Sequence, residues 1–410
     1  MNHVIIAGAG HAGIQLADSL RTEGYSDRIT LVDAETGLPY QRPPLSKDFL
    51  AADGTPELVP LKARKFFADK DIELVEANPI VSVDRHERAV TLANGDRLPY
   101  SALVFATGAR TRRLVAPGAD LGGVHHLRSA DDATRLRSEL AAARTVVVVG
   151  AGFIGLEFAA AAVDRGLDVT VVELGPRAMG RAVSAQISEY FQRLHAARGV
   201  RFVFDQTVSA FEGDAERVRA VVGGDGRRYP ADLVVVGIGV EPNETAATDA
   251  GLRTDNGIVV NEYLRTDDDA IWAIGDCARF PCRHAGAPIR RESIQNAVDQ
   301  ARTLAATLTG RPTEYHHSPW FWSYQGKTKL QIAGVARGDG PITVVGDPGE
   351  GKFSVLRFDE TRLVCVESVN HPAAHMAARS ILSTASPISQ EELAIVAFDL
   401  KLAARLSRTA

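Results

Sequence analysis

The sequence predicts an α/β protein that contains two doubly wound parallel sheets and a smaller C-terminal α+β domain. The chain has 410 residues, and at ~100–200 residues per domain this length allows two or three domains. An apolar strand, a glycine turn and an amphipathic helix occur in succession at residues 4–20 and again at 146–163. From about His316 the pattern changes to alternating aromatic and β-branched residues, which favours a separate C-terminal domain.

Each repeated segment has the parts of a complete βαβ unit. An apolar run leads directly into a G-x-G-x-x-G turn, a helix follows, and the next strand ends in a carboxylate. The parts are 4–7, Gly8-Ala9-Gly10-His11-Ala12-Gly13 and Asp33 in the first unit, and 146–149, Gly150-Ala151-Gly152-Phe153-Ile154-Gly155 and Glu173 in the second. Fully apolar runs such as 146–149 suit strands that are covered on both faces, as in a parallel sheet.

The two glycine motifs predict two Rossmann-like nucleotide-binding domains. The first glycine permits the tight turn, the second lets the backbone approach a pyrophosphate, and the third lets the helix pack closely on the sheet. The helix N-terminus then receives the phosphate charge. Asp33 lies 25 positions after Gly8 and Glu173 lies 23 after Gly150, near the ~20-residue offset of a carboxylate that binds ribose hydroxyls. The alternative for each motif alone is a plain strand-to-helix turn.

The carboxylate of Glu173 favours NADH over NADPH as the ligand of the second unit. A carboxylate at this position repels the 2′-phosphate of NADPH and accepts hydrogen bonds from the free hydroxyls of NADH. Arg177 and Arg181 lie nearby in the sequence and argue the other way, because an arginine can hold a 2′-phosphate.

The composition is that of a soluble globular protein, with 45% hydrophobic and 24% charged residues. The net charge of −5 argues against a nucleic-acid binder. The N-terminus runs straight into a glycine turn without a leader pattern, and no segment approaches the ~18 apolar residues of a membrane span. We therefore expect a cytoplasmic protein. The three cysteines fit a reducing compartment, and Cys277 and Cys282 lack the remaining ligands of a metal site.

Two further strand-to-turn segments, at 101–108 and 233–239, are expected where the chain crosses between domains. They divide the chain into a discontinuous first domain of residues 1–110 and 240–315, a second domain of 111–239, and a C-terminal domain of 316–410. Helices are expected at about 372–384 and 389–406. Another helix is expected to begin after Ser293, a good N-cap, and to run to about Leu308.

The chain resembles the flavoprotein ferredoxin reductases of the putidaredoxin-reductase, rubredoxin-reductase and biphenyl-dioxygenase-reductase type, nearly from end to end. The segments that carry the resemblance are Pro39-Tyr40-Gln41-Arg42-Pro43-Pro44-Leu45-Ser46-Lys47, Ala106-Thr107-Gly108, Gly150-Ala151-Gly152-Phe153-Ile154-Gly155-Leu156-Glu157, Ala273-Ile274-Gly275-Asp276, Glu292-Ser293-Ile294-Gln295-Asn296-Ala297 and Pro319-Trp320-Phe321-Trp322-Ser323. The resemblance implies a glutathione-reductase-like fold that binds FAD in the first unit and NADH in the second.

The resemblance also implies the residues that bind each nucleotide. Those expected at FAD are Gly8, Ala9, Gly10, His11, Ala12, Gly13, Asp33, Glu35, Arg42, Lys47, Val81, Ala106, Thr107, Gly108, Arg128, Gly275, Asp276, Ser293, Ile294 and Trp320. Those expected at NADH are Gly150, Gly152, Phe153, Ile154, Gly155, Glu157, Glu173, Gly237, Ile238 and Gly239.

Two charged residues are expected to act directly in the reaction. By the resemblance, Lys47 lies beside the reactive edge of the flavin, where its charge stabilises the negative charge of the reduced ring. Glu157 faces the nicotinamide, and we expect it to pair with Lys47 when NADH is absent. Asp276 is expected at the ribityl chain and Trp320 near the flavin. The alternatives are ordinary surface, capping and core roles for the same residues.

The function implied by the resemblance is that of an NADH:ferredoxin oxidoreductase. Hydride passes from NADH to FAD, and single electrons then pass to an acidic [2Fe-2S] ferredoxin that serves a haem monooxygenase or a Rieske dioxygenase. Six basic residues are candidates for the docking face, or else part of a scattered solvated surface: Arg290, Arg291, Arg311, Lys327, Lys329 and Arg337. Tyr324 departs from the family pattern, which usually has an acid there.

Two other functions remain open at this stage. They are a reductase of a small acceptor, such as a quinone, and a flavin-bound sensor of NADH. Disulfide reductase chemistry is disfavoured, because it needs a redox-active cysteine near the flavin and no cysteine precedes Cys277.

Overall fold

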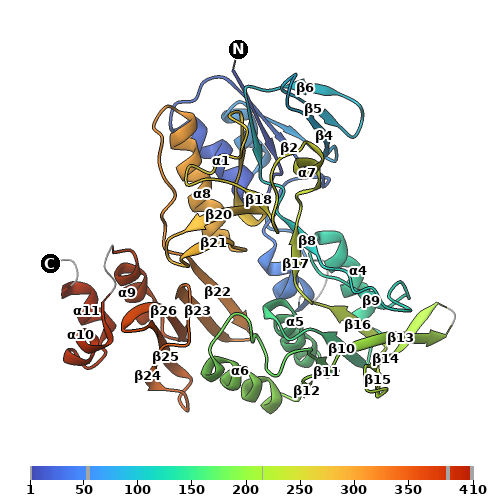
Figure 1. The fold of residues 1–410 in the computed structure, drawn as a ribbon. Helices are drawn as coiled ribbons and strands as arrows, with labels where there is room; N and C mark the ends of the chain where they lie inside the picture. The colour runs from blue at the N-terminus through green and yellow to red at the C-terminus, as the bar shows by residue number, and fades with distance from the viewer. Residues whose placement is uncertain (1, 52–55, 215, 385–387, 407–410) are drawn as a thin grey trace.

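The computed structural model describes residues 2–51, 56–214, 216–384 and 388–406, and it contains three bodies (Figure 1). The outer ends of the predicted domain ranges, residue 1 and residues 407–410, lie outside the described residues. In Figure 1 the first body, blue and gold, lies at the top. The second body, green, lies at the lower right, and the orange and red C-terminal body lies at the lower left.

The first body is built on a five-stranded parallel sheet with the strand order β19-β7-β1-β2-β3. Every residue of β1 is buried, as expected for a central parallel strand. The edge strand β19 comes from far along the chain and pairs with β7, so the later segment completes the first sheet. The elements of the first body that precede the crossing into the second body are β1 (His3–Ala7), α1 (His11–Thr22), β2 (Arg28–Val32), η1 (Pro43–Ser46), α2 (Asp48–Ala51), α3 (Arg64–Asp69), β3 (Ile72–Val75), β4 (Ile80–Asp84), β5 (Ala89–Leu92), β6 (Arg97–Pro99) and β7 (Ala102–Phe105).

The second body repeats this plan with the parallel order β12-β11-β10-β16-β9. In the register of its central strand, Val147 pairs with Thr170 on one side and Val234 on the other. A small antiparallel sheet, β13-β14-β15, is attached to it. The elements are β9 (Val124–His125), α4 (Ala130–Leu140), β10 (Thr145–Val149), α5 (Phe153–Asp164), β11 (Asp168–Val172), α6 (Ala185–Ala197), β12 (Arg201–Val203), β13 (Val208–Asp214), β14 (Arg217–Gly223), β15 (Arg228–Pro230) and β16 (Leu233–Val236).

The chain leaves and re-enters the first body through two strands that pair with each other. These are β8 (Ala109–Thr111) and β17 (Val240–Pro242), which run antiparallel with Ala109 opposite Pro242. After this crossing the chain completes the first body with α7 (Thr245–Asp249), β18 (Ile258–Val259), β19 (Ile271–Ala273), η2 (Gly275–Cys277), β20 (Ala278–Cys282), β21 (Ala287–Arg290) and α8 (Ile294–Leu308). Helix α8 begins and ends where the sequence predicts, and the Ser293 hydroxyl accepts a hydrogen bond from the backbone N–H of Asn296 at 3.1 Å.

The C-terminal body is an antiparallel sheet, β22-β23-β26-β25-β24, with helices packed on it. Its elements are β22 (Trp320–Gln325), β23 (Thr328–Gly334), β24 (Ile342–Asp347), β25 (Lys352–Asp359), β26 (Arg362–Val369), α9 (Pro372–Leu382), α10 (Gln390–Ile395) and α11 (Leu400–Leu406). The prediction of one helix over 389–406 is wrong. The backbone turns left-handed at Ala397 and Phe398, with φ of 48° and 57°, and this turn separates α10 from α11.

One hydrophobic core joins the three bodies. It contains Leu45 and Phe49 of the first body, Phe158 of the second, and Ile332 and Phe353 of the third, all buried. Helix α5 of the second body contacts both η1 of the first body and β22 of the third, and Figure 1 shows it below the first body and beside β22. Because apolar side chains from all three bodies pack together here, the groups at the edge of this core are held in fixed relative positions.

Candidate active site

A cavity of about 1110 Å³ opens where the three bodies meet. This is larger than the ~300–1,000 Å³ of common small-molecule sites. Its walls come from the first glycine turn, the η1 segment, the start of α5, the start of α8 and strand β22. Seventeen of the residues predicted at FAD line it: Gly8, Ala9, Gly10, His11, Ala12, Asp33, Glu35, Arg42, Lys47, Ala106, Thr107, Gly108, Arg128, Gly275, Asp276, Ser293 and Ile294.

The three glycines of the first turn have different roles. A Cβ at Gly8 would lie 2.3 Å from the carbonyl oxygen of Ala106, and one at Gly13 would lie 1.9 Å from the carbonyl oxygen of Gly8. A Cβ at Gly10 would meet no protein atom within 4 Å. Gly8 and Gly13 are therefore required by packing, with Gly13 outside the cavity wall. Gly10 leaves space above an α1 N-terminus that has no side-chain cap, which suits the approach of a pyrophosphate.

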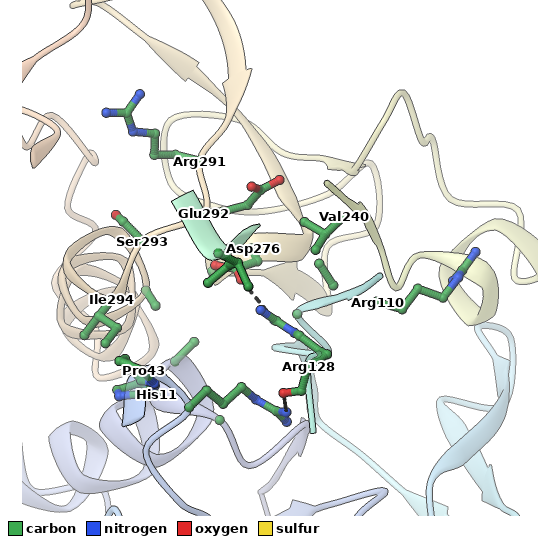
Figure 2. A pocket seen from close by; sticks show the side chains of 18 of the residues that line it. His11, Pro43, Arg110, Arg128, Val240, Asp276, Arg291, Glu292, Ser293 and Ile294 are labelled. Atoms are coloured by element: carbon green, nitrogen blue, oxygen red, sulfur yellow. Dashed lines mark hydrogen bonds and ion pairs between the residues drawn. The ribbon is translucent and has the colours of Figure 1, made fainter. Parts of the chain in front are cut away.

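Charged side chains follow the wall away from this turn. Arg42 forms an ion pair with Glu35 at 2.5 Å and donates to the carbonyl oxygen of Arg128 at 2.9 Å. The Arg128 guanidinium reaches Asp276 at 3.3 Å, and Figure 2 shows these two side chains turned toward each other. Burial raises the pKa of Asp33, which accepts a hydrogen bond from the Ala34 N–H at 2.8 Å. A carboxylate at the strand end and a row of cations beyond it match the ribose and phosphates of a dinucleotide.

At the far end of the cavity, Lys47 and Glu157 form the predicted ion pair. The Lys47 Nζ lies 2.5 Å from Glu157 Oε2, and the Ser46 hydroxyl donates to the same oxygen at 2.6 Å. The other carboxylate oxygen accepts from the Ser323 hydroxyl at 2.6 Å. The Glu157 side chain is only 4% exposed and that of Lys47 is 24% exposed. A buried carboxylate is thus satisfied by donors from the first and third bodies.

The second nucleotide unit meets the same cavity from the opposite side. Phe153, Ile154 and Glu157 line the cavity at the start of α5, whose N-terminal residue Gly152 provides no side-chain cap. The other predicted residues of this unit lie outside the cavity wall: Gly150, Gly152, Gly155, Glu173, Gly237, Ile238 and Gly239. A Cβ at Gly150 would lie 2.6 Å from the carbonyl oxygen of Gly237, which explains why glycine is needed at this turn.

The carboxylate of Glu173 lies at the turn, as the spacing predicts. It accepts hydrogen bonds from the N–H of Ala151 at 2.6 Å and of Gly175 at 2.8 Å. Arg177, the first of the two arginines that could hold a 2′-phosphate, is engaged in hydrogen bonds within the protein. Its guanidinium donates to the carbonyl oxygens of Gly180 at 2.7 Å and Val183 at 2.9 Å.

Besides Gly13, two of the residues predicted at FAD lie outside the cavity. The Val81 residue is 53% exposed, and its neighbours Pro79 and Ile80 line the wall instead. Trp320 packs under the Arg379 guanidinium at 4.2 Å from its ring centre, whereas Trp322 lines the cavity. Trp320 and Trp322 are two residues apart on β22 and therefore lie on the same face of the strand, so the strand pattern alone does not decide which ring lines the cavity.

The site also contains residues that the sequence reasoning did not single out for a role. Ser46 and Ser323 bind the carboxylate of Glu157, and Arg357 of β25 lines the cavity. Both serines lie inside segments that carry the family resemblance, next to Lys47 and Trp322. Their position in those segments is the only sequence signal, since a serine by itself is too common to stand out.

The six basic residues proposed for docking do not form one set of free cations. Arg290 pairs with Glu292 at 2.6 Å, Arg337 pairs with Asp359 at 2.7 Å, and Arg311 pairs with Glu23. Lys329 lies over the Tyr324 ring, 5.3 Å from its centre. Arg291 lines the cavity and Lys327 is exposed on the turn after β22. The positive charge available near the cavity is therefore smaller than the sequence indicates.

Comparison with known proteins agrees with this geometry. Residues 2–301 match the pyridine nucleotide-disulphide oxidoreductase family, and residues 320–404 match a family described as reductase C-terminal. The chain belongs to the pyridine nucleotide-disulphide oxidoreductase family. Members of this family bind FAD and use NAD(P)H. Rhodocoxin reductase of Rhodococcus erythropolis is 49% identical over 98% of this chain and 94% of that protein.

Two solved structures of the family have nearly the same fold. The ferredoxin reductase for the CYP199A2 system of Rhodopseudomonas palustris superposes with a TM-score of 0.95 at 46% identity, covering 98% of this chain and all of that one. The reductase in a covalent putidaredoxin reductase–putidaredoxin complex superposes with a TM-score of 0.93 at 36% identity, covering 98% and 97%. The predicted glutathione-reductase-like fold and the family resemblance are confirmed.

This chain differs from what its family's name suggests in one respect. The three cysteines are buried free thiols, and none of them lines the cavity in the described part of the chain. Burial raises the pKa of Cys277, the first of them in the sequence, so it stays a thiol. A dithiol cannot therefore relay electrons from the site. Within the same described ranges, no helix has the length and apolar character needed to cross a membrane.

Proposed function

We propose that this protein is an FAD-dependent NADH:ferredoxin oxidoreductase. The observation that carries the proposal is the Lys47–Glu157 ion pair, which lies in a cavity reached by both nucleotide units. A site with two dinucleotide motifs, charged groups at their meeting point and no reactive thiol fits a reaction whose electrons leave through the flavin to an external acceptor. The named relatives support the same activity, since one is named as the reductase of rhodocoxin and another as the ferredoxin reductase for the CYP199A2 system.

FAD, when bound, supplies the acceptor for a hydride and the donor of single electrons. The first glycine turn and Arg42, Arg128 and Asp276 hold its phosphates and sugar chain. Lys47 stabilises the negative charge that builds on the ring system. The α8 N-terminus, with the Ser293 side chain occupied by capping, adds backbone N–H groups and the positive end of the helix dipole.

Glu157 has a different part in this proposal. It neutralises Lys47 while the nicotinamide is absent and orients the nicotinamide carboxamide when NADH is bound. The start of α5 binds the pyrophosphate of NADH, because its N–H groups have no side-chain cap. Orientation by Glu157 brings the nicotinamide to a position from which hydride can transfer directly.

The proposal specifies NADH because of Glu173 and the position of Arg177. Glu173→Ala removes the carboxylate that repels a 2′-phosphate, so the ratio of kcat/KM for NADH to that for NADPH should fall about tenfold, the effect of ~1.4 kcal/mol. Glu189→Gln, on the exposed surface of α6, is the control. An unchanged ratio in Glu173→Ala would show that this carboxylate does not decide the choice of nucleotide.

The proposed partner is a small acidic [2Fe-2S] ferredoxin that serves a haem monooxygenase or a Rieske dioxygenase. The covalent complex of putidaredoxin reductase with putidaredoxin, whose reductase superposes on this chain, supports a protein partner of this kind. The cations available for its acidic side chains are Arg291, which lines the cavity, and Lys327 and Lys329, which lie on the turn after β22 and at the start of β23. The free buried thiols agree with a cytoplasmic location for the protein.

The experiment that tests the proposal is an anaerobic titration of the purified protein with NADH, followed by stopped-flow addition of oxidised [2Fe-2S] ferredoxins. Bleaching of bound flavin, a long-wavelength charge-transfer band and rapid ferredoxin reduction are expected. Purified protein that takes up no flavin would overturn the proposal. Bleaching without transfer to any ferredoxin would leave FAD and NADH in place and direct the search to a small acceptor, or to a sensing role.

A further inference from the structure

A buried chain of hydrogen bonds leads from Glu157 away from the cavity and into helix α6. The Ser323 hydroxyl donates to Glu157 Oε1 at 2.6 Å, and the Gln325 amide donates to the Ser323 oxygen at 2.9 Å. The His195 ring nitrogen Nε2 lies 3.2 Å from the Gln325 carbonyl oxygen. The exposed fractions are 5% for Glu157, 2% for Ser323, 1% for Gln325 and 0% for His195. Four polar residues from α5, β22 and α6 are thus connected out of contact with solvent.

In this chain of hydrogen bonds, every residue donates toward Glu157. Gln325 offers its carbonyl oxygen to His195, so the imidazole must donate from Nε2. The Gln325 amide then donates to Ser323, and the Ser323 hydroxyl is left to donate to the carboxylate. His195 is neutral at pH 7, because burial lowers its pKa to about 4. A neutral ring with one N–H defines the orientation of the whole chain.

Gln325 also binds the helix that carries Glu157. Its amide donates to the carbonyl oxygen of Phe153, at the start of α5, at 3.3 Å. The same side chain therefore contacts the first turn of the nucleotide-binding helix and, through Ser323, the carboxylate one turn later. Glu157 Oε2 binds Ser46 and Lys47 of the first body. The carboxylate is consequently held at both oxygens, one by each neighbouring body.

We propose that Ser323, Gln325 and His195 are positioning residues for Glu157. They hold Oε1 in place, so that the plane of the carboxylate is set before NADH binds and the nicotinamide is received in the orientation for hydride transfer. This inference rests on the proposed function. It assigns these three residues no contact with NADH and no part in proton transfer.

Interrupting this chain of hydrogen bonds should affect the orientation of the nicotinamide more than the affinity for NADH. Ser323→Ala removes the donor to Oε1, and Gln325→Leu removes the amide that fixes the direction of the Ser323 hydroxyl. In either variant the carboxylate can turn about its remaining fixed partners, Ser46 and Lys47. The adenosine half of NADH is held elsewhere, at Glu173 and the start of α5. Hydride transfer should therefore slow about tenfold while the Kd of NADH changes less than about threefold, because misorientation at the reacting end lowers the rate more than the affinity.

The test measures the rate of flavin bleaching, the charge-transfer band of the reduced enzyme with NAD⁺, and the Kd of NADH in wild-type protein and in the variants Gln325→Leu, Ser323→Ala and the double variant. The three variants should show the same tenfold loss and a weakened charge-transfer band, because each interrupts one chain. Tyr324→Phe is the matched control. It lies between the two residues on β22 and is 39% exposed, and it keeps the ring that packs against Lys329.

His195 is tested by a pair of substitutions. His195→Leu removes the donor to Gln325 and should slow hydride transfer less than Gln325→Leu does, because the Gln325 amide keeps its bonds to Phe153 and Ser323. His195→Gln offers an amide N–H in place of the imidazole N–H and should restore most of the rate. Flavin content and Tm are measured for every variant, since a role in folding alone would change these and leave the charge-transfer band of the folded fraction unaltered.

The outcomes separate this inference from the function on which it rests. Wild-type protein that is not bleached by NADH would contradict the proposed function. Wild-type protein that is bleached, together with Gln325→Leu and Ser323→Ala variants that match it in rate and charge-transfer absorbance, would overturn the positioning role alone. Equal losses in Tyr324→Phe and Gln325→Leu would also overturn it.

Discussion

At the scale of single residues, whether a buried charged side chain is stable depends mainly on whether it has hydrogen-bond or ion-pair partners. Glu157 is almost fully buried and remains satisfied, because Ser46, Lys47 and Ser323 converge on it. Glu367 is fully buried at the contact between β26 and α6, where it accepts from the Ser184 N–H at 3.0 Å. Burial raises the pKa of Glu367. Both carboxylates join separate bodies, and removing the partners of either would leave a costly buried charge.

His195 predicts a pH dependence of stability. Its pKa is about 4 in the folded protein and 6.5 for the ordinary group, so the unfolded chain binds more protons between these values. Stability is then lost as the pH falls from 6.5 to about 4. A pKa difference of this size lowers the free energy of unfolding by about 3 kcal/mol once the pH is below both values.

Chemical denaturation at several pH values measures this effect. In His195→Gln the free energy of unfolding should fall less steeply than in wild-type protein across the same window. Identical slopes for the two proteins would show that His195 does not account for the acid sensitivity. His375, whose pKa burial also lowers to about 4, should contribute part of the fall that remains in the variant.

At the scale of elements, the two nucleotide units show how a helix start becomes a binding site. Both α1 and α5 begin at a glycine with no side chain to cap the helix, so their first N–H groups are free for a ligand. By contrast, α4 begins with a full capping box formed by Ser129 and Asp132. The two kinds of helix start differ in local chemistry, because a cap residue satisfies the first N–H groups and an uncapped glycine turn leaves them open.

The first glycine turn allows a matched pair of substitutions. In Gly10→Ala the new Cβ meets no protein atom, so the protein should fold and its affinity for FAD should fall about tenfold or more through loss of the close approach to phosphate. In Gly13→Ala the Cβ would lie 1.9 Å from the Gly8 oxygen, so folding itself should suffer, by at least ~1–3 kcal/mol.

Flavin absorbance per mole of protein and the Tm of the apoprotein distinguish the two effects. Gly10→Ala should lose flavin with an unchanged apoprotein Tm, and Gly13→Ala should lower the Tm. Full flavin content in Gly10→Ala would contradict the assignment of this turn to FAD.

On the scale of the whole molecule, the protein carries a net charge of −5 and would have to attract an acidic partner through a local patch. Many arginines near the cavity are already paired within the protein, as with Arg290 and Glu292. Attraction must then come from a few cations, with Lys327 the most exposed candidate at the turn after β22. Interactions between exposed charges weaken beyond a Debye length of ~8 Å at physiological salt.

Salt should therefore slow the reduction of ferredoxin by the protein and leave the reduction of the protein by NADH unchanged. The second-order rate of ferredoxin reduction should fall several-fold between low and high NaCl, whereas flavin bleaching by NADH stays constant. Lys327→Ala should lower the rate at low salt and flatten its salt dependence. Lys65→Ala, on the exposed face of α3, is the control, and equal effects of the two substitutions would argue against docking at the β22 turn.

The sequence by itself determined the two βαβ units, the carboxylates that follow their second strands, the start and end of α8 and the family, because each depends on residues close together in the chain or on motifs read directly. It also predicted the pairing of Lys47 with Glu157, by resemblance. It was wrong about the continuous helix at 389–406, because two left-handed residues end α10 where the hydrophobic pattern continues. It also predicted Val81 and Trp320 at FAD, whereas the nearby Ile80 and Trp322 line the cavity instead.

Only the tertiary structure decided which side chains reach the cavity and which partners they find there. Residues 46, 157, 195, 323 and 325 come from three bodies, and no local pattern indicates that they meet. The pairing of Arg290, Arg311 and Arg337 with nearby acids is equally invisible in the sequence. Hydrogen bonds and ion pairs act over a few ångströms, so the packing of the three bodies against one another, and not the order of residues along the chain, determines them.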